Sequence, residues 1–174
     1  MAFLRNIVMF ASNEGGHFAQ MLALKNLFNR YKTVILTDNK HANFNLPELE
    51  QVEAIEYAMS HANMRNKLSK KRNKKLTKAS YLGAYFGLFK ECFISFWKHR
   101  PKVIISTGSN IAVPLCLISK IMGGKFVYIE TRAKVYSKTL TGKVIGGLAD
   151  VVIVQWPEMV DVYNGKAKYL GTLV

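Results

Sequence analysis

Residues 5–17 read Arg-Asn-Ile-Val-Met-Phe-Ala-Ser-Asn-Glu-Gly-Gly-His, which predicts a buried strand, a glycine turn and the start of a helix. The predicted strand covers 5–10, and apolar residues recur at helical spacing over 17–31. A strand that turns into a helix through a glycine pair directs backbone N–H groups outward, and such groups bind anions. The segment therefore predicts an α/β fold with a ligand site at the end of its first strand, where His17 would face the ligand.

The remaining pattern alternates strands with helices. Short apolar runs predict strands at 32–37, 52–57, 102–106, 125–129 and 151–154, and helices are predicted at 81–97, 112–122 and 139–148. Because these strands are continuous apolar runs, we expect a parallel sheet covered on both faces. Internal repeats and Gly/Ser linkers are absent from the sequence. We therefore predict one Rossmann-like, doubly wound domain over 1–174, with a basic loop and an apolar helix at about 62–99.

Composition and charge limit the possible partners. The 174 residues are 49% hydrophobic and 21% charged, which is typical of a globular chain. Cys92 and Cys116 form no CxxC pair, and we interpret both as reduced and buried in a cytosolic protein. No signal peptide is recognisable at the N-terminus. The net charge of +14 indicates an acidic partner, namely nucleic acid, anionic lipid or a phosphorylated substrate.

Three predicted strand ends contain the polar residues suited to chemistry: 12–17, 106–110 and 130–132. In an open parallel sheet these ends share one edge, so we expect them to converge on one crevice. They offer two glycine loops for oxyanions, the imidazole of His17, the carboxylate of Glu130 and the guanidinium of Arg132. A carboxylate directly after a buried strand is well placed to orient or deprotonate a hydroxyl.

Purely structural interpretations of these residues remain open. The glycine pair could simply form a tight turn, and His17 could cap the helix. Glu130 and Arg132 could form an ion pair with each other or contact solvent. The sequence contains neither GxGxxG nor GxxxxGK[ST], which argues against NAD and ATP. It also lacks GxSxG, a Cys/His nucleophile arrangement and metal-ligand spacing, so we predict no metal and no cofactor.

A basic run precedes the predicted apolar helix. Between residues 65 and 78 the chain has eight Lys or Arg and no Asp or Glu. These are Arg65, Lys67, Lys70, Lys71, Arg72, Lys74, Lys75 and Lys78. The aromatic residues of the helix include Tyr85, Phe86, Phe89, Phe93 and Trp97.

Two interpretations of this region are open. The basic run is either a solvated loop or a segment drawn to anionic lipid, and the helix either packs on the sheet or lies in the membrane interface. At 17 residues with Lys90-Glu91 in its middle, the helix is poorly suited to span a bilayer. Nucleic acid is not the expected partner, because no recognition helix, RRM or KH motif is present.

Taken together, these motifs resemble a known family. Residues 12–17, Ser-Asn-Glu-Gly-Gly-His, resemble the Gly-Gly-His loop of lipid-linked GT-B glycosyltransferases. Residues 102–110, followed by Pro114 and by 119–123, are similar to the second glycine loop of that group. Residues 126–133, Phe-Val-Tyr-Ile-Glu-Thr-Arg-Ala, resemble a signature of the Alg14-like proteins, which include bacterial PssD/CpsF polysaccharide-biosynthesis proteins. The resemblance extends over nearly the whole chain, to 169–171.

The resemblance implies half of a split enzyme, equivalent to the N-terminal domain of a GT-B glycosyltransferase. An Alg13-like partner (PssE/CpsG in bacteria) would bind the UDP-sugar, and the enzyme would be active only with it. This chain would bind the acceptor, a polyprenyl-pyrophosphate-linked sugar at the cytoplasmic face of the cell membrane. His17 and Glu130 would be catalytic. The residues at the acceptor pyrophosphate and the cleft would be Asn13, Gly15, Gly16, Thr107, Gly108, Ser109 and Arg132.

One departure from the family pattern concerns membrane attachment. Eukaryotic members begin with a membrane span, which this sequence does not show. We therefore expect peripheral or monotopic attachment through 65–97 and a bacterial source. Two other functions stay open: a self-sufficient single-domain enzyme that binds a nucleotide or phosphorylated sugar, and a non-catalytic membrane scaffold.

Overall fold

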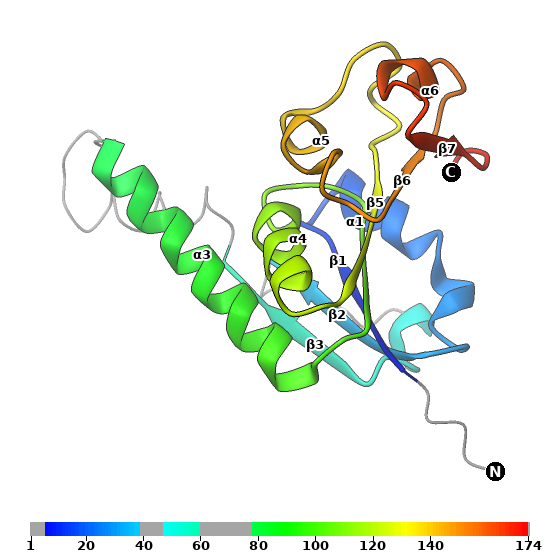
Figure 1. Cartoon of the computed structure of the whole chain (residues 1–174). Coiled ribbons are helices and arrows are strands. Elements are labelled where there is room, and N and C mark those ends of the chain that lie inside the picture. The colour runs from blue at the N-terminus through cyan, green and yellow to red at the C-terminus, as the bar shows by residue number, and fades with distance from the viewer. Residues whose placement is uncertain (1–5, 39–46, 60–77, 174) are drawn as a thin grey trace.

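A computed structural model describes residues 6–38, 47–59 and 78–173. In this part of the chain a seven-stranded parallel sheet has the order β3-β2-β1-β4-β5-β6-β7 (Figure 1). The strands are β1 Ile7–Ala11, β2 Lys32–Thr37, β3 Ala54–Tyr57, β4 Val103–Ser106, β5 Lys125–Ile129, β6 Val151–Val154 and β7 Ala167–Tyr169. The helices are α1 Gly16–Leu22, α3 Lys78–His99, α4 Ala112–Ile121, α5 Leu140–Ile145 and α6 Met159–Val162, with 3-10 turns η1 Lys25–Leu27 and η2 Pro47–Leu49.

The predicted doubly wound parallel sheet is confirmed, and the differences lie at element ends and in two short elements. The predicted helix over 17–31 is wrong beyond Leu22. There the Leu24 N–H donates to Met21 O, three residues back, and the chain tightens into 3-10 geometry before β2. The short elements α6 and β7 were not predicted, because four and three residues are too few to show a period.

The order of the strands reverses between β1 and β4. From β1 the chain moves outward through β2 to β3, and from β4 it moves the other way to β7. At the C-terminal end of β1, Ala11 pairs with Leu36 of β2 and with Ser106 of β4. In open parallel sheets, ligands bind outside the C-terminal strand ends at such a reversal. The fold therefore places the loops after β1 and β4 at the expected ligand site.

The two faces of the sheet have separate cores. On one face Phe18 and Met21 of α1 pack with Phe10 and Ile35 of the sheet. On the other face α3, α4 and α5 cover a larger cluster (Figure 1). Because alternate strand residues point to opposite faces, strands buried on both sides are apolar at most positions. This burial accounts for the continuous apolar runs in the sequence.

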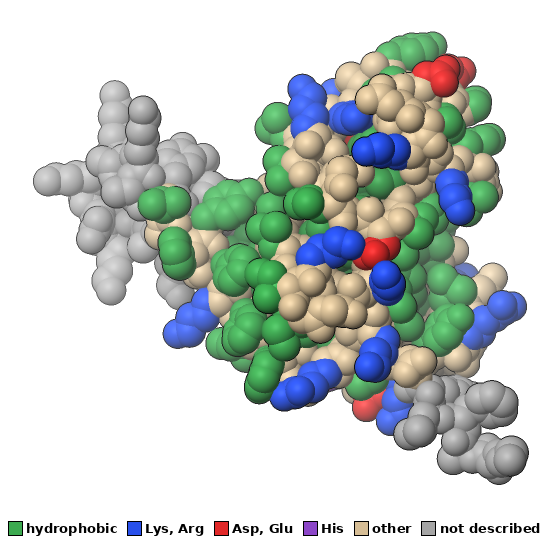
Figure 2. Space-filling model, in the orientation of Figure 1, with side chains coloured by type: hydrophobic (Ala, Val, Ile, Leu, Met, Phe, Trp, Pro, Cys, Tyr) green, Lys and Arg blue, Asp and Glu red, His purple; other side chains and the backbone are tan. Residues whose placement is uncertain are grey.

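Helix α3 has a buried side and an exposed apolar side. Ala84, Leu88, Cys92 and Phe96, spaced four residues apart, are buried in the core. Exposed positions on α3 are also largely apolar, and Figure 2 shows these side chains over the helix. They include Leu82, Tyr85, Phe86, Phe93, Ile94 and Trp97, whereas Phe89 is half-buried against the core. The helix therefore packs on the sheet and also presents an apolar stripe.

The rest of the predicted membrane region is described only in part. Arg65, Lys67, Lys70, Lys71, Arg72, Lys74 and Lys75 lie outside the described residues, and Lys78 is the first residue of α3. Within the described ranges, no helix combines the length and the apolar character needed to span a bilayer.

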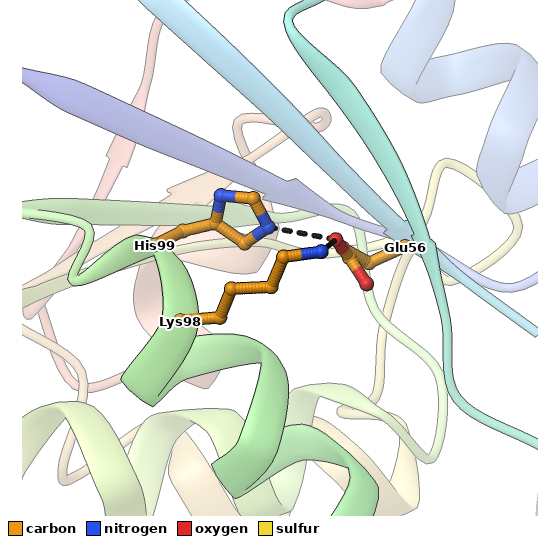
Figure 3. A network of polar contacts seen from close by, with 3 residues as sticks. All are labelled: Glu56, Lys98 and His99. Atoms are coloured by element: carbon orange, nitrogen blue, oxygen red, sulfur yellow. Dashed lines mark hydrogen bonds and ion pairs between the residues drawn. The ribbon is translucent and has the colours of Figure 1, made fainter.

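A polar contact fixes the C-terminal end of α3 to the edge strand β3. The Lys98 ammonium and His99 Nε2 both lie 2.8 Å from Glu56 Oε1 (Figure 3). Partial burial favours the neutral acid, but the hydrogen bonds from Lys98 and His99 outweigh it and hold the pKa of Glu56 below its ordinary value. The Lys98 ammonium, in the last turn of α3, also interacts favourably with the helix dipole. This end of α3 is therefore held in place while its apolar stripe faces outward.

Candidate functional site

The loops after β1 and β4 contact each other directly. His17 Nδ1 lies 2.8 Å from the carbonyl oxygen of Thr107, and the Thr107 hydroxyl donates to the carbonyl oxygen of His17 at 2.8 Å. Because a carbonyl can only accept, the proton must be on Nδ1. In the neutral imidazole, Nε2 then has the lone pair. The structure thus defines the tautomer of His17, and Nε2 is the ring atom able to accept a proton.

Glycine is required at position 108 for two reasons. Its φ of +110° lies in the region that L-residues rarely adopt. In addition, a Cβ at Gly108 would lie 3.1 Å from His17 Cε1 and 3.2 Å from His17 Nδ1. The backbone of the second loop therefore approaches the imidazole more closely than any other residue type would permit.

A second set of contacts joins the same two loops through Asn13. The Asn13 amide donates to Asp38 Oδ2 at 2.8 Å, and the backbone N–H of Glu14 donates to Asp38 Oδ1 at 2.8 Å. The Ser109 hydroxyl donates to Asn13 Oδ1. Ser109 has a φ of +82°, a strained conformation that surrounding contacts must hold. Asp38, at the end of β2, thus orders the first loop, and Asn13 connects it to the second.

The glycine pair of the first loop borders open space. Gly15 and Gly16 are exposed, and a Cβ added at either would meet no protein atom within 4 Å. Packing within the described chain therefore does not explain the lack of a side chain at Gly16, whose backbone φ is ordinary. A ligand that approaches the backbone closely would explain it.

Glu130 is placed differently from the other predicted site residues. It is 1% exposed, and its carboxylate accepts hydrogen bonds from Tyr128 Oη at 2.9 Å and Tyr163 Oη at 2.7 Å. Further donors are the Thr131 N–H at 2.9 Å, the Thr139 N–H at 3.2 Å and the Thr139 hydroxyl at 3.0 Å. Burial, and then the neighbouring Glu130, raise the pKa of Tyr128 and of Tyr163. Both phenols therefore stay protonated and act as donors to the carboxylate.

Arg132 is exposed and is held through its backbone. The indole N–H of Trp156 donates to the Arg132 carbonyl oxygen at 2.7 Å. Among the described residues no ion pair joins Glu130 and Arg132, so of the two structural interpretations left open by the sequence, the ion pair is not found. The Arg132 guanidinium thus belongs to the surface, and the Glu130 carboxylate to the interior.

Several organising residues were missed by the sequence reasoning. Gln155 is buried; its amide donates to Gln20 Oε1 at 2.7 Å and to the Glu130 carbonyl oxygen at 2.9 Å, which connects β6, α1 and the end of β5. Asp38 and Gln155 both directly follow strands, so the rule about strand ends would have found them. Tyr163 had no such signal, because it comes from the distant segment after α6.

Comparison with known proteins supports the resemblance noted in the sequence. The family model for "Oligosaccharide biosynthesis protein Alg14 like" matches residues 7–173. The chain is 26% identical over 180 residues to a protein of Mus musculus named UDP-N-acetylglucosamine transferase subunit ALG14, covering 96% of this chain and 82% of the mouse protein. It is 27% identical over 180 residues to the Schizosaccharomyces pombe protein of the same name, covering 97% and 83%. These relatives are eukaryotic, so the expectation of a bacterial source gains no support from them.

Solved structures share the fold at low identity. MurG of Acinetobacter baumannii matches with a TM-score of 0.61 and 15% identity, covering 96% of this chain and 45% of MurG. UDP-N-acetylglucosamine 2-epimerase of Rickettsia bellii matches with a TM-score of 0.65 and 10% identity, covering 97% of this chain and 45% of the epimerase. The Rossmann-like fold is confirmed, with GT-B glycosyltransferases such as MurG as neighbours. The chain spans less than half the length of these structures.

Proposed function

Because the chain belongs to the Alg14-like family of oligosaccharide biosynthesis proteins, we propose that it is the acceptor-binding subunit of a two-chain glycosyltransferase. The contact between the Gly-Gly-His loop and the second glycine loop carries this proposal. It places His17, the open backbone at Gly16 and the Thr107–Ser109 turn at the reversal point of the sheet.

The donor in this proposal is a UDP-sugar bound by a second, Alg13-like chain. This chain matches 45% of MurG, and in this proposal the second chain supplies the donor-binding half. UDP-N-acetylglucosamine is the first donor to test, because the mouse and fission-yeast relatives are named for it. The acceptor is a polyprenyl-pyrophosphate-linked sugar, whose phosphates would face the backbone N–H groups at Gly15 and Gly16.

His17 is the proton acceptor in this proposal. An acceptor hydroxyl attacks the anomeric carbon of the donor, the bond from that carbon to UDP breaks, and the hydroxyl proton passes to His17 Nε2. The hydrogen bond from Nδ1 to Thr107 keeps the imidazole in the required tautomer. Attack from the face opposite UDP would invert the anomeric centre.

Gly16→Asp tests the cleft. Its side chain enters open space, so the fold should tolerate it, while its carboxylate would repel the acceptor phosphates. We expect transfer by the complex with the partner to be abolished. Gly147→Asp is the matched control, since a Cβ there also meets nothing within 4 Å and Gly147 lies between α5 and the start of β6, before the N-terminal end of that strand. Normal transfer by folded Gly16→Asp would contradict the proposal.

We also propose that the apolar stripe of α3 attaches the subunit to the membrane surface. Phe86 is 72% exposed and Trp97 49% exposed, and the Arg100 guanidinium lies 4.1 Å from the centre of the Trp97 ring. An exposed aromatic stripe next to a basic run is typical of helices that bind anionic lipid interfaces.

Vesicle binding tests this attachment. The double variant Phe86→Ser, Phe93→Ser should lose cosedimentation with phosphatidylglycerol vesicles, as should a variant with Lys70, Lys71, Arg72, Lys74 and Lys75 changed to Gln. The control Leu170→Ser removes a leucine that is 73% exposed after β7 and should bind normally. Unchanged binding of the first two variants would refute the attachment.

A further inference from the structure

The carboxylate of Glu130 has no capacity left for a substrate. A carboxylate offers about four lone-pair sites. Tyr128, Tyr163, Thr131 and Thr139 direct donors at them over distances of 2.7 to 3.2 Å, and the residue is 1% exposed. A hydroxyl of the acceptor would have to displace one of these donors to reach the carboxylate. Direct proton transfer to Glu130 therefore conflicts with its surroundings.

The same carboxylate holds the first turn of α5. Thr139 is the N-cap of α5, and its hydroxyl accepts the Gly142 N–H at 2.9 Å while it lies 3.0 Å from Glu130 Oε1. A Cβ on Gly142 would overlap with the Tyr163 hydroxyl and with Glu130 Oε2. Helix α5 thus begins directly against the buried carboxylate, and its position depends on these contacts.

Helix α5 in turn contacts the second glycine loop. The Thr141 hydroxyl donates to the carbonyl oxygen of Ser109 at 3.4 Å. Ser109 is the residue with a φ of +82°, and its hydroxyl donates to Asn13 of the first loop. A strained backbone persists only when its surroundings hold it. One line of contacts therefore leads from Glu130 through Thr139 and Thr141 to Ser109.

From these contacts we infer that Glu130 is a positioning residue, which acts through α5 and Thr141 to hold the 107–109 turn in its acceptor-binding conformation. The inference rests on the proposed function for the identity of the acceptor. It replaces the catalytic role that the family resemblance suggested for Glu130, and it leaves proton transfer to His17.

Two variants test the inference. Glu130→Gln keeps the size of the side chain but replaces one acceptor oxygen with a donor group that faces other donors. Thr141→Val removes only the hydroxyl that reaches Ser109. Thr33→Val is the matched control, because the Thr33 hydroxyl also faces backbone carbonyls at 3.4 Å, those of Phe28 and Tyr31. Thr33 lies near the start of β2, at the end of the sheet away from the loops after β1 and β4.

The first measurement is steady-state transfer by the complex with its partner, using a diphosphate-linked lipid acceptor. We expect Thr141→Val to raise the KM for acceptor about three- to tenfold with little change in kcat. Glu130→Gln should raise it further, and the pH profile of kcat should keep its shape. Loss of one limb of that profile in Glu130→Gln would overturn the inference, because it would identify Glu130 as the proton acceptor. A KM for Thr141→Val equal to that of Thr33→Val would also overturn it.

The second measurement is amide hydrogen exchange over 107–110 in the full chain, which needs no activity. Faster exchange in Thr141→Val than in Thr33→Val supports the inference, and equal exchange overturns it. If Glu130→Gln fails to fold, the KM and hydrogen-exchange results for Thr141→Val alone decide whether the inference holds. A wild-type complex that transfers no sugar would refute the proposed function, whereas hydrogen exchange would still decide whether α5 holds the turn.

Discussion

Replacing Gly108 with alanine tests whether the close approach of the two loops is as tight as the structure indicates. A φ of +110° costs an L-residue about 1–3 kcal/mol. The added Cβ would also lie 3.1 Å from His17 Cε1, so the imidazole or the turn has to shift by a few tenths of an ångström. We expect the free energy of unfolding to fall by about 2–3 kcal/mol, which for a chain of this size lowers Tm by about 5–10 °C.

Urea unfolding of the full chain, followed by circular dichroism, measures this loss. Gly16→Ala is the matched control, because the same methyl group there meets no atom within 4 Å and the backbone φ is ordinary. It should change the unfolding free energy by less than about 0.5 kcal/mol. Transfer by the complex should fall about tenfold or more in Gly108→Ala, since the His17 ring is displaced. An unfolding free energy within about 0.5 kcal/mol of wild type would refute the reasoning about the turn.

Two further predictions concern titratable groups away from the cleft. Partial burial favours protonation of Asp150, but hydrogen bonds from the Phe126 N–H, Lys120 and Lys125 outweigh it and lower its pKa from 3.8 to about 2. The unfolded chain thus binds this proton more readily than the folded chain. In urea titrations, wild type should be more stable than Asp150→Asn by about 1–2 kcal/mol above pH 4, and this difference should disappear as the pH falls from 4 through 2. A constant difference across that range would contradict the assignment. Burial raises the pKa of the Cys116 thiol to about 11 and also raises the pKa of the Cys92 thiol. Ellman's reagent should therefore react with neither cysteine until the chain is unfolded. Rapid labelling of the native chain would contradict the burial of these thiols.

Prediction from the sequence succeeded where a local pattern has a single structural explanation. Continuous apolar runs between helical segments require a parallel sheet covered on both faces, and this correctly predicted the seven-stranded core apart from β7. The convergence of the first two loops also followed, because parallel strands end at one edge. It was confirmed by the contacts of His17 with Thr107 and of Asn13 with Ser109.

Element ends were less predictable for a physical reason. Apolar spacing continues beyond Leu22 because those residues still face the core, yet the backbone there has changed to 3-10 geometry. Hydrophobic periodicity reports burial, and burial does not distinguish one turn type from another.

The sequence alone determined the class of fold, the family and the presence of two glycine loops at the centre of the sheet, because these depend on the order and spacing of residue types. Only the tertiary structure decided what each side chain faces. Glu130 follows β5 just as the first loop follows β1, yet Tyr163, far along the chain, encloses it and α5 covers it. Helix α3, apolar on nearly every side in the sequence, packs on the core through Leu88 and leaves Phe86 exposed. Such outcomes depend on contacts between distant segments, which no local pattern specifies.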